Sequence, residues 1–184
     1  MPYYKRLEGE RLYLSPPDPG EAEKLAEWNN DLDFSILTGQ AAEMFPLPKV
    51  RQSLQSMSAA GHHFAIVDRA AERFVGICAL TGVNEHHRYA SLVISIGDPE
   101  FRHKGYGQEA VRLLLHYGFT ELHLHNVELG VYEYNKAAIR CYEKCGFREI
   151  GRRRKAKLIA GRRYDIVWMD MLADDFLKEG ADAT

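Results

Sequence analysis

The residues best suited to chemistry in this chain form a basic, glycine-containing turn, Arg102–Gly107. Gly105 and Gly107 allow the backbone to approach an anion without an intervening Cβ. Arg102 and Lys104 add full positive charges. If a helix begins here, its first turn offers backbone N–H groups without intrahelical partners and a partial positive charge. Such a turn can hold a phosphate, so we expect a pyrophosphate site. Tight packing of a strand against a helix is the alternative explanation for the glycines.

The flanking residues predict the elements that place this turn. Leu92–Ile96 is apolar and rich in β-branched residues, which favours a strand, and Gly97-Asp98-Pro99 ends it. After the turn, apolar residues recur at spacings of three and four, as on one face of a helix. The turn lacks the third glycine of the dinucleotide fingerprint and the Gly-Lys-Ser/Thr ending of the ATPase phosphate loop. The residues on the predicted helix face are Ala110, Val111, Leu114, Leu115 and Gly118.

A second strand–helix unit carries polar groups that could meet a ligand. Val127–Tyr132 alternates apolar and polar residues and predicts a strand, after which Asn135 can cap a helix that Gly146 ends. Tyr142 lies seven residues after Asn135, about two helical turns, and so on nearly the same face. A phenol with a pKa of about 10 is protonated at neutral pH and can donate its proton. Packing of Tyr142 on a sheet, and capping as the whole task of Asn135, are the alternatives.

This pair of motifs resembles the GNAT superfamily of acyl-CoA-dependent N-acetyltransferases. The resemblance is closest to the branch with the ribosomal-protein N-terminal acetyltransferases and the spermidine acetyltransferases. It extends from Gly9–Leu12 to the strand near Met169–Leu172, and Asn84–Ala90 and Ile96–Pro99 match as well. It implies one α/β domain over residues 1–184, with an ordered core of about 9–178. Its sheet would be mixed and mostly antiparallel, splayed at the central strand Tyr89–Ile96 and flanked by helices.

The resemblance also implies roles for individual residues. The turn would bind the pyrophosphate of acetyl-CoA, and Asn135 would hydrogen-bond the pantetheine arm. Backbone N–H groups of the splayed strand would polarise the thioester carbonyl, like an oxyanion hole, and Tyr142 would be the general acid. The cofactor-binding residues would be Ile94, Ser95, Ile96, Arg102, His103, Lys104, Gly105, Tyr106, Gly107 and Asn135.

The general base is where the chain departs from the family pattern. Relatives often carry a glutamate on the central strand where this chain has Ser91. A serine without a partner cannot act as a base at neutral pH. The proton could leave through ordered water or through Glu85, His86 or His87, since imidazole is chemically suited to the task. An amine that is already partly neutral would need little help.

The resemblance implies transfer of an acetyl group from acetyl-CoA to a primary amine by direct attack in a ternary complex. The amine could be a protein N-terminus, a polyamine or another small amine. The alternative is a CoA-binding regulatory module without turnover, and a third reading is a binder of nucleotide phosphates. Turnover with a panel of amines separates the first two, because a binding module would show affinity without product.

Composition narrows the class of protein further. A net charge of −2 over 184 residues argues against a dedicated nucleic-acid binder. We therefore expect an amine substrate as the partner, with no DNA and no membrane, and a homodimer is left open. The three cysteines have no paired spacing, which suits a reducing cytoplasm, and no apolar stretch after Met1–Arg6 indicates a signal peptide. The eight histidines lack the spacing of a hydrolytic zinc site, so we expect no metal.

The hydrophobic pattern predicts the remaining elements. A loop or short helices are expected over Asn30–Pro48. Helices are expected at Pro19–Asn29, with Ala22, Leu25, Ala26 and Trp28 turned inward, and at Lys49–Ala60, Gly105–Glu121 and Asn135–Cys145. Strands are expected at Leu12–Leu14, Phe64–Asp68, Phe74–Val83, Tyr89–Ile96 and Val127–Tyr132, and as a closing hairpin of Phe147–Leu158 with Arg163–Leu172.

Overall fold

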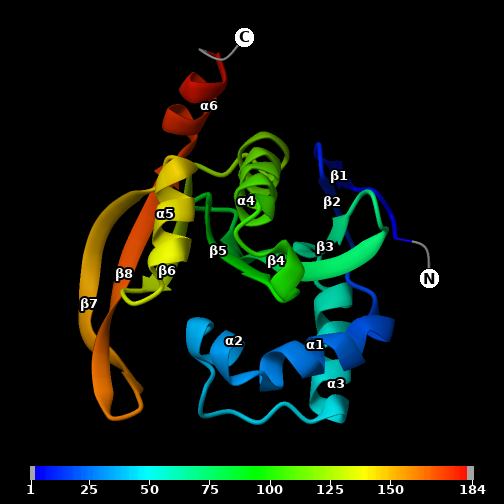
Figure 1. Ribbon diagram of the computed structural model, residues 1–184. Coiled ribbons are helices and arrows are strands. Elements are labelled where there is room, and N and C mark those ends of the chain that lie inside the picture. Colours follow the sequence, from blue (N-terminus) through cyan, green and yellow to red (C-terminus); the bar gives the residue numbers. More distant parts are fainter. Residues whose placement is uncertain (1–2, 182–184) are drawn as a thin grey trace. The chain divides into compact units, whose positions relative to one another are not determined.

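The computed structural model describes residues 3–181, with side chains up to residue 178 (Figure 1). The predicted domain 1–184 thus includes a few residues at each end that lie outside this range. The strands are β1 (Leu7–Glu8), β2 (Leu12–Ser15), β3 (His63–Asp68), β4 (Arg73–Asn84), β5 (Tyr89–Ile96), β6 (Asn126–Tyr132), β7 (Arg148–Ile159) and β8 (Arg162–Leu172). The helices are α1 (Ala22–Asn30), α2 (Leu32–Leu37), α3 (Leu47–Ala59), α4 (Tyr106–His116), α5 (Lys136–Lys144) and α6 (Ala173–Ala181), with short 3-10 turns at η1 (Pro19–Glu21) and η2 (Pro99–Phe101).

The strands form an eight-stranded sheet in the order β1-β2-β3-β4-β5-β6-β8-β7. The pairings β1–β2, β2–β3, β3–β4, β6–β8 and β7–β8 are antiparallel, and β5–β6 is parallel. A mixed, mostly antiparallel sheet with helices confirms the predicted fold class. None of the described helices is long and apolar enough to cross a membrane.

Most predicted elements are confirmed to within two residues, and β5 has the predicted bounds. The predicted helix Gly105–Glu121 differs, because its α-helical part ends at His116 and a π-helical turn, Tyr117–Glu121, follows. Gly118 lies in that turn, where an added Cβ would be only 3.0 Å from the side chain of Leu80. The glycine therefore lets the wider turn pack closely. The short strand β1 and the final helix α6 were not predicted.

The chain divides into two compact units, which we describe separately. The first contains the described residues of Met1–Ala79 and Ile94–Leu113, and the second those of Leu80–Val93 and Leu114–Thr184. In the first unit, α1 buries its predicted inward face, and the ring of Trp28 stacks on that of Phe74 with centroids 5.0 Å apart. Burial of a large apolar side chain such as Leu25 or Phe74 stabilises the fold by about 1.5–3 kcal/mol.

Gly76 of β4 allows the backbone of β5 to come close within the first unit. A Cβ at this position would collide with the carbonyl oxygen of Ser95 and lie 3.1 Å from Cα of Ile96. Just beyond β5, the backbone N–H groups of Gly97 and Asp98 both donate to the carbonyl of Val75, at 3.0 and 3.2 Å. The end of β5 is therefore held against β4 by main-chain contacts.

In the second unit, β6 and β8 divide their side chains between an apolar and a polar face. Their register pairs Val127 with Met171 and Leu129 with Met169, and all four side chains are buried. Side chains alternate along a strand, so the residues between them point to the other face. That face carries Glu128 of β6, which is half-buried.

The parallel pairing of β5 with β6 is short. It joins Tyr89 to Asn126, Ala90 to Val127 and Ser91 to Glu128. Within the described residues it ends there, although both strands continue. The splay predicted at Tyr89–Ile96 would separate β5 from β6 beyond this last pair, and it stays a prediction.

The contact of Gly76 with β5 gives a stability prediction. Gly76→Ala should lower the free energy of unfolding by about 1–3 kcal/mol in urea titrations, because the new methyl group meets backbone atoms that cannot rotate away. Gly61→Ala is the matched control, since a Cβ there meets nothing within 4 Å. Equal stability of the two variants would show that β5 can move back without cost.

Candidate active site

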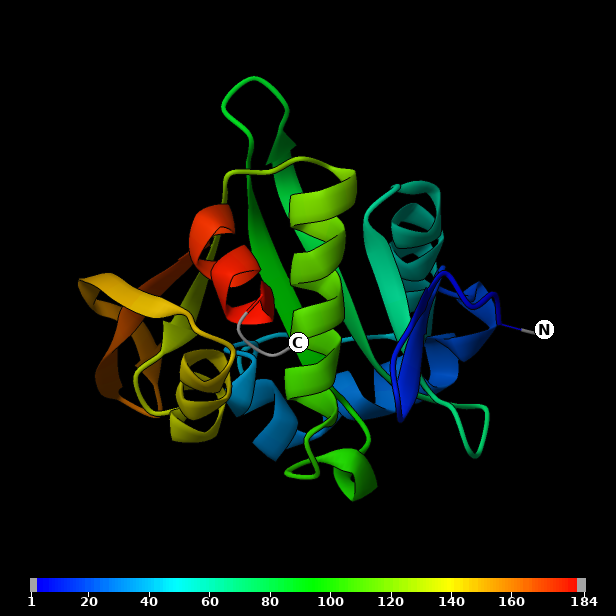
Figure 2. The ribbon, with the colours of Figure 1, turned by 90° about the horizontal axis from the view of Figure 1, so that it is seen from above.

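The basic turn leads directly into α4, as predicted. Figure 2 shows α4 (green) rising from the loop that contains the turn and η2. His103 and Gly105 both have positive φ, 60° and 85°. This left-handed conformation costs a glycine little, and it turns the chain sharply into the helix. The backbone N–H groups of the first helical turn are the donors that an anion would meet.

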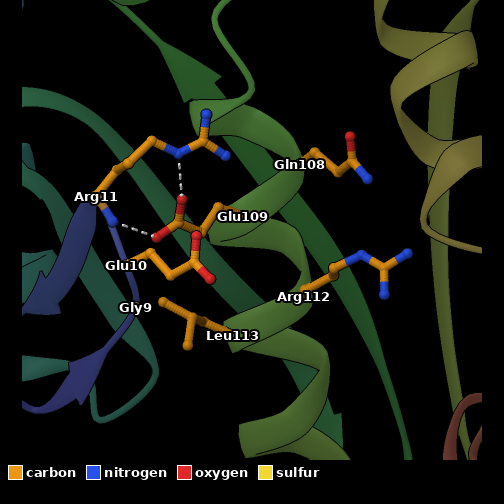
Figure 3. Close-up of a pocket in the computed structure, with 7 residues that line it drawn as sticks. All are labelled: Gly9, Glu10, Arg11, Gln108, Glu109, Arg112 and Leu113. Atoms are coloured by element: carbon orange, nitrogen blue, oxygen red, sulfur yellow. Dashed lines mark hydrogen bonds and ion pairs between the residues drawn. The ribbon is translucent and has the colours of Figure 1, made fainter. Parts of the chain in front are cut away.

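Arg11, directly before β2, holds this turn in place. Figure 3 shows its second contact, with Glu109 of α4. Its Nη1 donates to the carbonyl of Lys104 at 2.7 Å, and its Nε donates to Oε2 of Glu109 at 2.8 Å. The peptide group is planar and trans, so its C=O and N–H point in opposite directions. Because the Lys104 carbonyl points toward Arg11, the N–H of Gly105 points away from it. Arg11 therefore orients one of the donors expected to bind the anion.

Tyr106 is anchored by its side chain. Its hydroxyl donates to Oδ1 of Asp68 at 2.5 Å, and its ring packs edge-on against Phe101 at 5.0 Å. Burial, followed by the bond to Asp68, raises the pKa of Tyr106 to about 12. The hydroxyl thus fixes the start of α4 on β3, and only the backbone of Tyr106 remains for the predicted role in anion binding.

Arg102 has a contact set that its sequence position did not reveal. Its Nε donates to the carbonyl of Ile96 at 3.0 Å and its Nη2 to that of Gly97 at 2.5 Å. The guanidinium also lies over the ring of Phe34, 5.2 Å from the centroid. Arg102 therefore ties the turn to the end of β5, while the side chain of Lys104 is exposed. Ile94, Ser95 and Ile96 are half-buried at that strand end.

In the second unit, Asn135 and Tyr142 belong to α5 as predicted. The side-chain oxygen of Asn135 accepts from the backbone N–H of Ala138 at 3.1 Å, so helix capping is realised. Tyr142 is half-buried, and its ring centroid lies 5.8 Å from that of Phe147. Burial raises the pKa of Tyr142 above the usual value for a phenol. The hydroxyl consequently stays protonated throughout the neutral range.

The candidate bases of the sequence occupy two different places. Glu85, His86 and His87 are exposed in the turn between β4 and β5, where the two imidazole rings pack edge-on at 4.6 Å. Ser91 is half-buried on β5, and its hydroxyl donates over a long 3.4 Å to Oε1 of Glu128. The sequence analysis predicted neither a role for Glu128 nor the hydrogen bonds of Arg11 to Lys104 and Glu109. The available signals were the polar position of Glu128 between Val127 and Leu129 and the match at Gly9–Leu12.

A shallow pocket lies between the start of β2 and α4 (Figure 3). It is lined by Gly9, Glu10, Arg11, Gln108, Glu109, Arg112 and Leu113. None of the predicted site residues lines it. Among the described side chains, no group of three or more His, Cys, Asp or Glu is arranged to hold a metal ion.

The chain resembles known acetyltransferases over most of its length. Residues 11–148 match the model of the acetyltransferase (GNAT) domain. A spermidine N(1)-acetyltransferase of Vibrio cholerae is 35% identical over 112 residues, covering 61% of this chain and 64% of that protein. The chain thus aligns with less than two thirds of the length of this curated relative. A probable N-acetyltransferase of Bacillus subtilis, YjcK, is 29% identical over 89% of this chain and 92% of its own.

Solved structures agree with this assignment. The spermidine N-acetyltransferase of Vibrio cholerae in complex with CoA and spermine superposes with a TM-score of 0.82 at 26% identity, covering 92% of this chain and 99% of that one. The family match and these relatives support the prediction of an acetyl-CoA-dependent N-acetyltransferase. Because the family model covers three quarters of the residues, this chain belongs to the GNAT acetyltransferase family.

Proposed function

We propose that this chain transfers an acetyl group from acetyl-CoA to a primary amine, and that the amine is a polyamine such as spermidine. The observation that carries the proposal is the glycine turn before α4, whose Lys104 carbonyl is held by Arg11 at 2.7 Å. The choice of a polyamine is supported by the names of the relatives and by the relative solved with CoA and spermine. A cytoplasmic location and a homodimer remain predictions from the sequence.

The turn would bind the pyrophosphate mainly through its backbone. The N–H groups at the start of α4 point outward from the helix end, and the helix dipole adds a partial positive charge. Lys104 is the exposed cation of the turn, while Arg102 already donates to two carbonyl groups. The residues present therefore fit an anionic cofactor.

The chemistry would follow a direct attack. The amine nitrogen forms a bond to the acetyl carbon, the C–S bond breaks, and the hydroxyl of Tyr142 gives its proton to the departing sulfur. N–H groups of Ile94–Ile96 would stabilise the charge that develops on the carbonyl oxygen. Cys145 is disfavoured as a covalent acyl carrier, because its side chain is fully buried.

A thiol-release assay tests this function. Purified protein with acetyl-CoA should release free CoA thiol above the hydrolytic background when spermidine or spermine is added. An aminoglycoside, free amino acids and N-terminal peptides complete the panel, and turnover with one of these instead would replace the polyamine. Tight acetyl-CoA binding with no turnover for any amine would favour the regulatory module.

Loss of the hydrogen bond from Arg11 to the Lys104 carbonyl should weaken cofactor binding. Arg11→Ala removes a charged hydrogen bond to Lys104, worth about 1.5–3 kcal/mol, and so should raise the KM for acetyl-CoA roughly 10- to 100-fold with a smaller effect on kcat. Arg69→Ala is the matched control, because Arg69 donates to the carbonyl of Gly9 at 2.8 Å and pairs with Glu8. Similar KM changes in the two variants would mean that the effect is one of general stability.

Removal of the phenol should act on turnover. Tyr142→Phe should lower kcat by about 10²-fold, within the usual range for a general acid, and leave the dissociation constant of acetyl-CoA nearly unchanged. Because its pKa is raised, the acid form should persist as pH increases, and wild-type kcat should show no fall from Tyr142 ionisation below about pH 10. Tyr134→Phe, another half-buried phenol, is the control. Full activity of Tyr142→Phe would overturn the assignment.

A further inference from the structure

Direct attack requires a neutral amine, and the substrate arrives protonated. An alkylammonium has a pKa near 10.4, so only about one molecule in 10³ is neutral at pH 7. We propose that Glu128 accepts the proton of the attacking amine and that Ser91 holds the Glu128 carboxylate in position. This inference rests on the proposed function and names the proton acceptor that the sequence left open.

Strand register brings Glu128 to Ser91. The two residues form the last parallel pair between β5 and β6 within the described residues. The Ser91 hydroxyl donates to Oε1 of Glu128 at 3.4 Å. Its neighbours Val127 and Leu129 are buried on the apolar face, so Glu128 lies on the polar face of β6. The carboxylate of Glu128 thus lies beside Ser91, which could not act as a base by itself.

The carboxylate of Glu128 can accept a proton and hydrogen bonds beyond the one from Ser91. A carboxylate has about four lone-pair sites, and among the described residues the Ser91 hydroxyl is the one hydrogen-bond donor to Glu128. Asp170 lies opposite Glu128 on β8 and accepts from the amide of Asn126 at 2.8 Å. No Lys, Arg or His side chain of the described residues forms an ion pair with Glu128. Glu128 is therefore half-buried, without an ion-pair partner, and open to a cationic amine.

The other candidates lie far from the strand position where relatives often carry a glutamate. Ser91 occupies that position, and Glu128 is paired with it. His87 precedes Ser91 by four residues, roughly 13 Å in extended chain, and is exposed in the turn between β4 and β5. A side chain of that turn and one bridging water do not span such a distance.

The proton balance of the step is complete. The ammonium loses one proton to Glu128, which later releases it to solvent, and the neutral nitrogen attacks the acetyl carbon. When the amide forms, the nitrogen loses a second proton to solvent. That proton balances the one that Tyr142 gives to the thiolate, since Tyr142 is then reprotonated. The overall reaction converts the ammonium and acetyl-CoA into the acetylated amine, CoA thiol and one proton.

Two changes test the proposal: replacement of the carboxylate by an uncharged amide, and its relocation to the paired residue. Glu128→Gln should lower kcat for spermidine about 10²-fold at pH 7, as expected for loss of a general base, without raising the KM for acetyl-CoA. The deficit should shrink as pH approaches the pKa of the amine, because the substrate then arrives neutral. Asp170→Asn removes the same charge from the opposite position and should leave kcat close to wild type.

The double variant Ser91→Glu with Glu128→Gln moves the carboxylate to the paired residue of β5. It should recover a substantial part of the activity lost in Glu128→Gln, an outcome that a merely structural role would not produce. Wild-type kcat and an unchanged pH profile in Glu128→Gln, or equal losses in Asp170→Asn, would overturn the proposal while leaving the proposed function intact. Absence of wild-type turnover with every amine would contradict the proposed function, and this inference with it.

Discussion

The position of the start of α4 in the first unit depends on the hydrogen bonds that the Glu109 carboxylate accepts from Arg11 and Leu12. The carboxylate accepts from the backbone N–H and Nε of Arg11, at 2.9 and 2.8 Å, and from the N–H of Leu12 at 3.3 Å. Its side chain is 13% exposed, so these donors are needed to compensate its lost hydration. Charge-assisted bonds of this kind are stronger than neutral ones. They fix the first turn of α4 to the start of β2, and Arg11 then extends the same contact to Lys104.

In the proposed function, the anion site is built from backbone groups rather than from free cations. Two arginines near the turn, Arg11 and Arg102, both donate to main-chain carbonyls. Each restrains a peptide group, and a restrained peptide holds its N–H in a fixed direction. Donors oriented before the ligand arrives lose little entropy on binding. In the proposed function, Arg11 and Arg102 therefore act on the ligand through the backbone that they restrain.

The second unit shows how packing on one face of a sheet places chemistry on the other. The apolar pairs Val127–Met171 and Leu129–Met169 set the register of β6 against β8. A slip by one residue would turn every side chain of β6 over, so burial of this face specifies the register strongly. Glu128 is therefore turned to the polar face, and the separate pairing of β5 with β6 places it beside Ser91. The face on which the proposed proton acceptor lies is thus determined by the packing of valine, leucine and methionine side chains on the opposite face.

The sequence by itself determined the local elements, the strand–turn–helix motif and the family. Tyr89–Ile96, the inward face of α1 and the capping Asn135 could be predicted because periodicity and capping are properties of neighbouring residues. Helix α6 and strand β1 were not predicted, because α6 is a short terminal segment and β1 spans two residues. Only the tertiary structure decided which groups meet. Arg11 and Glu109 are 98 residues apart in the chain, and Ser91 and Glu128 are 37 apart. Such pairs are set by strand register and helix packing, which depend on the whole core rather than on neighbouring residues.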